Sequence, residues 1–157
     1  MLFRIRTALL AAFLMAGGLS GAVRGAESDH ANVGSDRVGI KGYDPVSYFE
    51  GTPQKGEQKF TAEYEGVIYR FASDAHKQRF LEAPATFVPA YGGWCAWAFA
   101  KDVGKVDIDP TSYRITDGRL FLFYKGWRGD ALKQWLPNEK ANIPKADANW
   151  QKTVEPK

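Results

Sequence analysis

Two short turns place the strongest constraint on the fold, because each lies between runs of alternating aromatic and β-branched residues. The first turn, Glu65-Gly66, joins residues 60–64 to residues 67–71. The second turn, Asp117-Gly118, lies within residues 113–124. A two-residue turn that ends in glycine between such runs is typical of a β-hairpin. The sequence therefore predicts two antiparallel hairpins.

A short helix is predicted after each hairpin. Ser73 is a helix-capping residue, and the pattern over residues 75–83 favours a helix that Pro84 ends. A second helix is predicted around residues 130–136, before Pro137. The predicted fold class is therefore α+β, a small single domain of two hairpins that are each followed by a helix.

The two predicted units resemble each other. Gly118 follows Gly66 by 52 residues, and the rings of Tyr69 and Phe71 recur as Phe121 and Phe123 at the same spacing. An internal duplication would produce this pattern, and so would a chance similarity between two aromatic-rich hairpins.

Cys95 is the single cysteine of the 157 residues, so no disulfide within the chain can stabilise the fold. Aromatic residues make up 14% of the sequence and supply large rings for burial. We therefore expect an aromatic-rich core to stabilise the domain without covalent links.

The N-terminus has the pattern of a secretory signal peptide over residues 1–26. Arg4 and Arg6 precede an apolar run at residues 8–16, and small residues follow at 17–22. A membrane anchor would need about 20 apolar residues, roughly twice the length of this run. Cleavage is expected between residues 22 and 26, after which no membrane span remains.

The rest of the chain divides into three parts. Residues 27–38 are polar and are interpreted as a flexible leader. Residues 39–151 form the predicted domain, and residues 152–157 a C-terminal tail. Without residues 1–26 the chain has 18 basic and 18 acidic residues, so its net charge is zero. A neutral domain does not attract nucleic acid, which leaves a small molecule or a protein as the expected partner.

Few side chains remain for binding a transition metal. Met1 and Met15 both belong to the signal peptide, which leaves Cys95, His76 and, in the leader, His30. A structural zinc site takes four ligands with close Cys or His pairs, and the sequence has no such pair. The candidate metal ligands are His76 and Cys95, and the candidate metals are copper and zinc.

Residues 91–99 combine four large rings, one thiol and two adjacent glycines, and we expect a helix here. Two glycines let a second molecule approach the backbone closely. The alternative is that the rings belong to the core. The segment predicts an aromatic-lined pocket with these ligand-binding residues: Tyr91, Gly92, Gly93, Trp94, Cys95 and Trp97.

Cys95 has two interpretations. In the first turn of a helix its thiol would ionise readily and could react, whereas a buried cysteine is a small apolar side chain in the core. A Cys-His catalytic pair would require Cys95 and His76 to meet, and no third orienting group is evident. The sequence contains no phosphate-binding loop, zinc-protease helix or serine elbow.

A family resemblance rests on residues 71–76 (FASDAH), followed by Phe80, Pro84 and Phe87. This string resembles the YHS domain, whose usual form is Phe-Cys-Ser-x-x-Cys followed by Phe, Pro and Tyr at these spacings. Further similar segments lie at residues 42–49, 91–96, 117–122 and 146–150. Over residues 39–151 the chain resembles the exported, single-domain YHS proteins of Gram-negative bacteria, which implies a periplasmic location.

The resemblance implies a function only in outline. YHS domains that keep both cysteines are linked to heavy-metal handling, but here Ala72 and His76 stand at those positions. We interpret the chain as a non-catalytic binding or accessory module. One alternative is a periplasmic copper- or zinc-binding protein that uses His76 with Cys95, and a second is a thiol-dependent enzyme.

Overall fold

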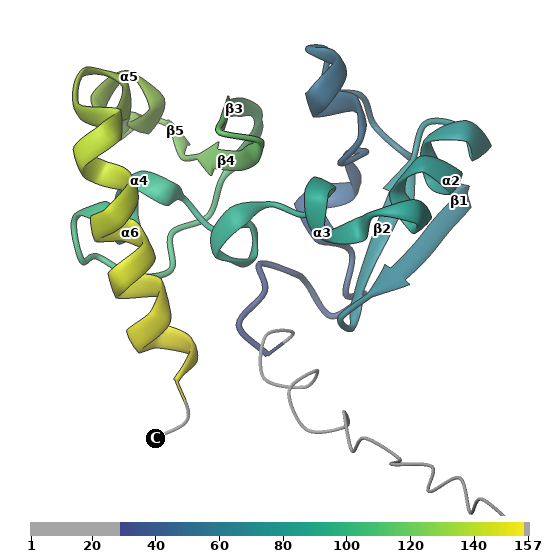
Figure 1. The fold of residues 1–157 in the computed structure, drawn as a ribbon, viewed down its shortest axis with the longest axis horizontal. Helices are drawn as coiled ribbons and strands as arrows, with labels where there is room; N and C mark the ends of the chain where they lie inside the picture. The colour runs from purple at the N-terminus through teal and green to yellow at the C-terminus, as the bar shows by residue number, and fades with distance from the viewer. Residues whose placement is uncertain (1–28, 156–157) are drawn as a thin grey trace, which may run out of the picture.

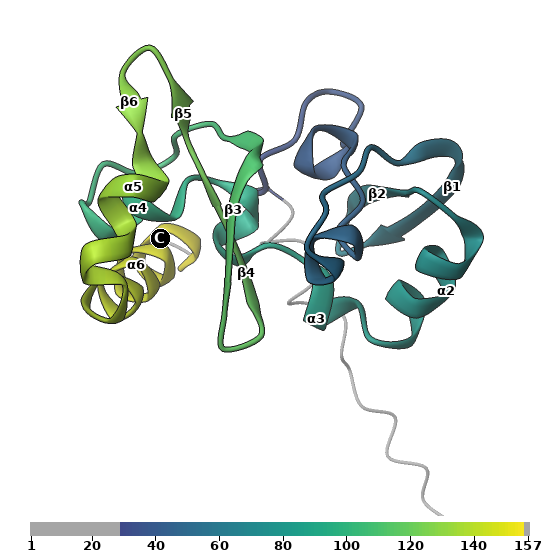
Figure 2. The same ribbon diagram turned by 90° about the horizontal axis from the view of Figure 1, so that it is seen from above.

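The elements form two groups that lie side by side in the computed structural model, which describes residues 29–155 (Figures 1 and 2). We call residues 38–88 the N-terminal lobe and residues 94–154 the C-terminal lobe. The predicted signal peptide lies outside the described residues. The N-terminal lobe contains the 3₁₀ helices η1 (Gly39–Gly42) and η2 (Ser47–Glu50), strands β1 (Glu57–Tyr64) and β2 (Val67–Phe71), and helices α2 (Asp74–Glu82) and α3 (Pro84–Phe87).

The C-terminal lobe follows the 3₁₀ helix η3 (Ala90–Gly93), which joins the two lobes. It contains helix α4 (Ala96–Ala100), strands β3 (Asp109–Thr116), β4 (Arg119–Phe123), β5 (Lys125–Gly126) and β6 (Gly129–Asp130), helix α5 (Ala131–Trp135), the 3₁₀ helix η4 (Leu136–Asn138) and helix α6 (Glu139–Val154). One continuous cluster of buried hydrophobic residues includes side chains from both lobes.

Both predicted hairpins are present. β1 pairs with β2 and β3 pairs with β4, each antiparallel, around the two turns that the sequence marks. Glu65 and Asp117 both have positive φ angles, as do the glycines after them, which is the backbone that a tight two-residue hairpin turn requires. The α+β class is confirmed. A third small hairpin, β5 with β6, was not predicted.

The two main hairpins repeat each other in register. Glu57 faces Phe71 in the first, and Asp109 faces Phe123 at the corresponding position of the second. Both ladders then shift register, between Glu57 and Thr61 and between Asp109 and Tyr113. Two hairpins that were similar only by chance would have no reason to share a register shift at the same position. The structure therefore favours the interpretation of the chain as an internal repeat.

The packing against the hairpins repeats as well. In the N-terminal lobe the ring of Phe80 packs on Tyr69 and Phe71, and in the C-terminal lobe the indole of Trp135 packs on Phe121 and Phe123. Each packing residue belongs to the helix that the sequence predicts after its hairpin. Side-chain capping by Ser73 and Asp130 starts these two helices, α2 and α5.

Residues 91–100 form two short helices where we expected one. Tyr91, Gly92 and Gly93 have φ angles of 55°, 60° and 85°, which a continuous α-helix cannot contain. Trp94 and Cys95 are extended, and only then does α4 begin. The α4 helix packs closely on α6.

α6 was not predicted as a helix, and it continues to Val154, past the domain end expected at residue 151. Pro144 within it lacks an N–H donor and normally breaks a helix. Packing outweighs this preference, because Ala146 and Trp150 are buried on the core side of α6.

Residues 29–38, expected to belong to a flexible leader, lie along the domain and bind to it. The backbone N–H of Asn32 donates to the Gly92 carbonyl at 2.8 Å, and the Trp94 indole N–H donates to the His30 carbonyl at 2.6 Å. Val38 forms a parallel bridge with Ile68 of β2. The bond from Asn32 satisfies the Gly92 carbonyl of η3, and the other contacts fix the polar segment against both lobes.

Among residues 29–155, no helix combines the length and the apolar character that a membrane crossing requires.

Candidate functional site

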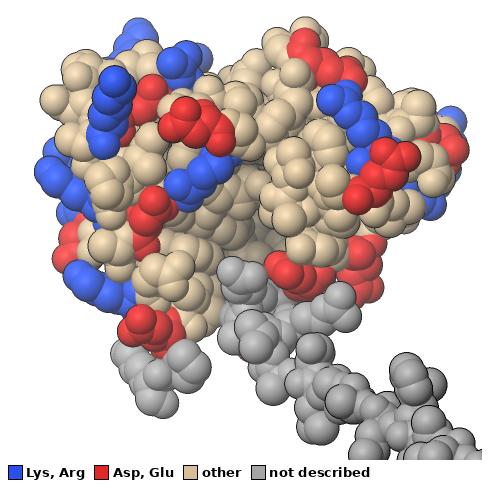
Figure 3. Space-filling view, in the orientation of Figure 1, with Lys and Arg blue, Asp and Glu red and all other residues tan. Residues whose placement is uncertain are grey.

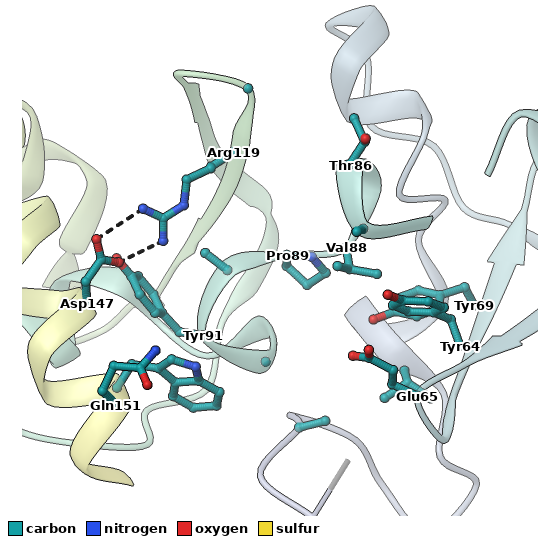
Figure 4. Close-up of a pocket in the computed structure, with 17 residues that line it drawn as sticks. Tyr64, Glu65, Tyr69, Thr86, Val88, Pro89, Tyr91, Arg119, Asp147 and Gln151 are labelled. Atoms are coloured by element: carbon teal, nitrogen blue, oxygen red, sulfur yellow. Dashed lines mark hydrogen bonds and ion pairs between the residues drawn. The ribbon is translucent and has the colours of Figure 1, made fainter. Parts of the chain in front are cut away.

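A cleft of about 550 Å³ lies between the two lobes. The space-filling view shows the surface hollowed here, and the close-up shows its two walls (Figures 3 and 4). The ends of both main hairpins reach the cleft, one through Glu65 and the other through Gly118 and Arg119. The repeat therefore forms the cleft, since equivalent turns approach it from opposite sides.

The N-terminal wall presents three oxygen-bearing side chains. Figure 4 shows the hydroxyls of Tyr64 and Tyr69 and the carboxylate of Glu65 pointing toward the opposite wall. Thr86 and Val88, at the end of α3, lie beside them. Burial, and then the nearby Glu65 carboxylate, raise the pKa of Tyr69, so its hydroxyl stays protonated and can donate.

The C-terminal wall is built around a three-residue network. Arg119 donates from Nη2 to Asp147 Oδ1 at 2.8 Å and from Nη1 to Asp147 Oδ2 at 3.2 Å. The Tyr91 hydroxyl donates to Asp147 Oδ1 at 2.9 Å. The Arg119 guanidinium lies 4.9 Å from the centre of the Phe121 ring and 5.7 Å from that of Tyr91. These contacts fix the orientation of the planar cation.

The network also fixes the charges of its members. Burial opposes ionisation of Asp147, but the bonds from Arg119 and Tyr91 outweigh it and lower the pKa of that carboxyl. The bond to Asp147 raises the pKa of Arg119, and burial raises the pKa of Tyr91. At neutral pH the wall therefore holds one anion, one cation and a protonated phenol.

Gly92 is required at the base of the cleft. A Cβ atom at this position would lie 3.1 Å from both the Ala31 Cα and the Trp150 ring, closer than ordinary contacts allow. Its φ angle of 60° also disfavours any other residue. Gly92 thus lets the leader and α6 meet below the cleft.

The six predicted ligand-binding residues separate into three groups. Tyr91 and Gly92 line the cleft. Gly93 and Trp94 do not line it but hydrogen-bond to residues of the leader. Cys95 and Trp97 line a second pocket of about 330 Å³ in the C-terminal lobe. The η3 turn causes this separation, because it reverses the chain between Gly92 and Cys95.

Cys95 is 1% exposed, and its Sγ accepts a hydrogen bond from the Tyr124 backbone N–H at 3.3 Å. Burial raises the pKa of the thiol above its ordinary value. A buried, protonated thiol is a poor nucleophile. The structure favours the core interpretation of Cys95 over the reactive one, and it offers no support for thiol catalysis.

His76 and Cys95 are not brought together. His76 lies on α2 in the N-terminal lobe and Cys95 precedes α4 in the other lobe, well separated in both ribbon views (Figures 1 and 2). The Nδ1 atom of His76 lies 2.5 Å from the fully buried Asp44, and Nε2 lies 3.3 Å from Glu50. The structure therefore does not bring the predicted pair of copper or zinc ligands together.

No group of three or more His, Cys, Asp or Glu side chains among residues 29–155 is arranged to hold a metal ion. The residues around His76 serve a structural role instead. The Asp44 carboxylate also accepts hydrogen bonds from the backbone N–H groups of Val46 and Ala72. Asp44 thereby holds the segment before η2 against the end of β2.

Sequence reasoning missed the polar residues of the cleft, namely Glu65, Arg119 and Asp147. The sequence did offer a signal for two of these residues, because Glu65 lies in the first hairpin turn and Arg119 follows the second. The turns alone do not show that both hairpin ends reach one cleft. Asp147 lies on α6, a helix that the sequence did not reveal.

Comparison of the chain with protein-family models, with curated proteins and with solved structures found no match. The resemblance to YHS domains therefore stays a prediction from the sequence.

Proposed function

We propose that this protein is a non-catalytic binding or accessory module whose ligand occupies the cleft between the lobes. The observation that carries the proposal is the cleft itself, at about 550 Å³. Small-molecule sites are concave, have volumes in this range, and combine aromatic surface with a few oriented polar groups. Here Tyr64, Tyr69, Tyr91 and Trp150 supply the aromatic surface, and Arg119 with Asp147 supplies an oriented polar pair.

The titration properties of the cleft support binding without catalysis. A general acid or base works best with a pKa near neutral pH. The pKa of Asp147 is lowered and those of Tyr69, Tyr91 and Arg119 are raised, so these four groups keep one protonation state near pH 7. Cys95, the candidate nucleophile, does not line the cleft.

We place the module in the periplasm and in the exported YHS group, on the sequence patterns at residues 1–26 and 39–151. The intact mass of the exported protein tests the location. We expect a mature chain that begins at Val23, Ala26 or Glu27. A full-length chain retained in the inner membrane would contradict the proposal.

The cleft can be blocked from one wall to test the binding function. Thr86 is exposed on α3 and lines the cleft, so Thr86→Trp should fill it with little effect on the core. Gln78→Trp, exposed on α2 and outside the cleft, is the matched control. A fragment library is screened by amide chemical shifts in the ¹⁵N-labelled protein.

We expect fragments that shift cleft amides in the native protein and in Gln78→Trp but not in Thr86→Trp. Fragments that shift only residues outside the cleft, or that bind Thr86→Trp equally well, would show that the cleft is not the binding site.

A further inference from the structure

The charges that line the cleft do not balance. Glu65, Arg119 and Asp147 are the charged side chains among its lining residues in the described chain. Arg119 and Asp147 neutralise each other through two hydrogen bonds. Glu65 has no hydrogen bond or ion pair within residues 29–155. Among the described residues, the cleft therefore presents one carboxylate that has no ion-pair partner.

The turn fixes Glu65 where its carboxylate faces the cleft. Its φ angle is 49°, and Tyr64 and Val67 pair on either side of the turn. The nearby cation Arg37 donates from Nε to the Gly66 carbonyl at 2.6 Å and forms no ion pair with this carboxylate. Glu65 is partly buried, which weakens solvent screening of its charge.

The surroundings of Glu65 are suited to an organic cation. Tyr64 and Tyr69 lie beside the carboxylate and turn their hydroxyl groups toward the cleft, where these oxygens can accept hydrogen bonds from an ammonium group (Figure 4). A divalent metal ion would need several more oxygen ligands than this wall offers. An anion gains less from Arg119 than from an unpaired guanidinium, because Asp147 already neutralises that cation through two hydrogen bonds.

The opposite wall supplies neutral polar contacts. Arg119 uses two of its five N–H donors on Asp147, and its side chain is 42% exposed. Gln151 of α6 adds an amide to the same wall. These groups are suited to hydroxyl, ether or carbonyl oxygens on an uncharged end of a ligand.

We propose that the cleft selects small organic monocations, with an ammonium group at Glu65 beside the hydroxyls of Tyr64 and Tyr69 and an uncharged polar end toward Arg119. This inference rests on the proposed function, since it assigns a ligand class to the same cleft.

Two matched pairs of probes test the selection. Choline is compared with its uncharged isostere 3,3-dimethylbutan-1-ol, and tyramine with 4-ethylphenol, by calorimetry and by amide shifts of the cleft residues. We expect at least one cation to bind about tenfold more tightly than its neutral partner. Glu65→Gln should abolish that preference. Glu63→Gln removes the same charge from an exposed position on β1 outside the cleft, and should keep the preference.

The outcomes separate the two proposals. If neutral probes or library fragments bind in the cleft without any preference for a cation, the binding function stands and the cation inference is wrong. If the preference survives in a folded Glu65→Gln variant, the ammonium site is not at Glu65 and the inference is again wrong. If neither probes nor fragments shift cleft amides, both proposals fail.

Discussion

Asp44 and Cys95 each accept a hydrogen bond from the backbone after a main hairpin, one through a carboxylate and the other through a thiol. Asp44 Oδ2 accepts the backbone N–H of Ala72, the residue after β2. Cys95 Sγ accepts the backbone N–H of Tyr124, the residue after β4. Each contact satisfies a backbone donor at the end of a hairpin. The thiol of Cys95 is thus a structural acceptor.

This role predicts that Cys95 is inert in the folded protein. Iodoacetamide at pH 8 should modify it at least about 100-fold more slowly in buffer than in denaturing urea, because the thiol is buried and its pKa is raised. Intact mass at timed intervals measures both rates. Similar rates in the two conditions would show that the segment opens readily and that the thiol is available.

At the level of elements, the hairpins carry the core of each repeat. Phe71 of β2 and Phe121 of β4 are fully buried, and each packs on the aromatic residue of the helix that follows its hairpin. Nothing covalent supports either hairpin, since the single cysteine is free. Ring packing between hairpin and helix therefore stabilises each hairpin without a covalent link.

Phe71→Ala and Phe121→Ala should each lower the free energy of unfolding by roughly 3–5 kcal/mol, because each leaves a cavity in a packed core. Trp127→Ala is the control, since this ring is 88% exposed on the β5–β6 hairpin and its loss should change stability by less than about 0.5 kcal/mol. Urea denaturation of the three variants gives the values. A loss below about 1 kcal/mol for either phenylalanine would contradict the packing described.

Glu139, the first residue of α6, links that helix to β3 and α5. Its Oε1 accepts hydrogen bonds from the Thr116 hydroxyl at 2.8 Å, the Trp135 indole at 3.0 Å and the Arg114 guanidinium at 3.3 Å. Burial acts to raise the pKa of Glu139, but these bonds outweigh it and lower the pKa below its ordinary value of 4.5.

A lowered pKa in the folded state means that ionised Glu139 stabilises the fold at pH values above 4.5. This contribution is lost as the pH falls through the folded-state pKa. Glu139→Gln should therefore be less stable than the native protein at pH 7, and the difference should shrink below pH 4.5. Urea midpoints between pH 7 and pH 3 measure it, with Glu82→Gln, an exposed glutamate of α2, as the control. If the stability difference between Glu139→Gln and the native protein did not change with pH, the loss would come from packing and not from the charge of Glu139.

The sequence predicted those elements whose signals are local. The turns at Gly66 and Gly118 and the cap at Ser73 depend on a few adjacent residues, and all three are confirmed. α6 was missed because Pro144 opposes a helix locally, while the burial that stabilises the helix comes from distant packing.

At the level of the whole molecule, the cleft depends on how the lobes meet, which no local pattern encodes. The Tyr48 hydroxyl of the N-terminal lobe donates to the Pro110 carbonyl of the C-terminal lobe at 2.7 Å, and its ring packs edge-on against Tyr113. At the surface, the ion pair of Lys41 with Asp107 also joins the N-terminal lobe to the C-terminal lobe. The sequence therefore marked Tyr91, Gly92 and the two hairpin turns of the cleft, but not how they come together around it.

These contacts between the lobes, together with the shared core, predict that the two lobes unfold as one unit. All five tryptophans lie in the C-terminal lobe, so tryptophan fluorescence reports on that lobe, whereas far-ultraviolet circular dichroism reports on both. The urea midpoints from the two signals should coincide. Phe71→Ala, in the N-terminal lobe, should shift both midpoints by the same amount. A fluorescence midpoint that stays at its native value in this variant would show that the lobes unfold independently, and the walls of the cleft would then be free to move apart.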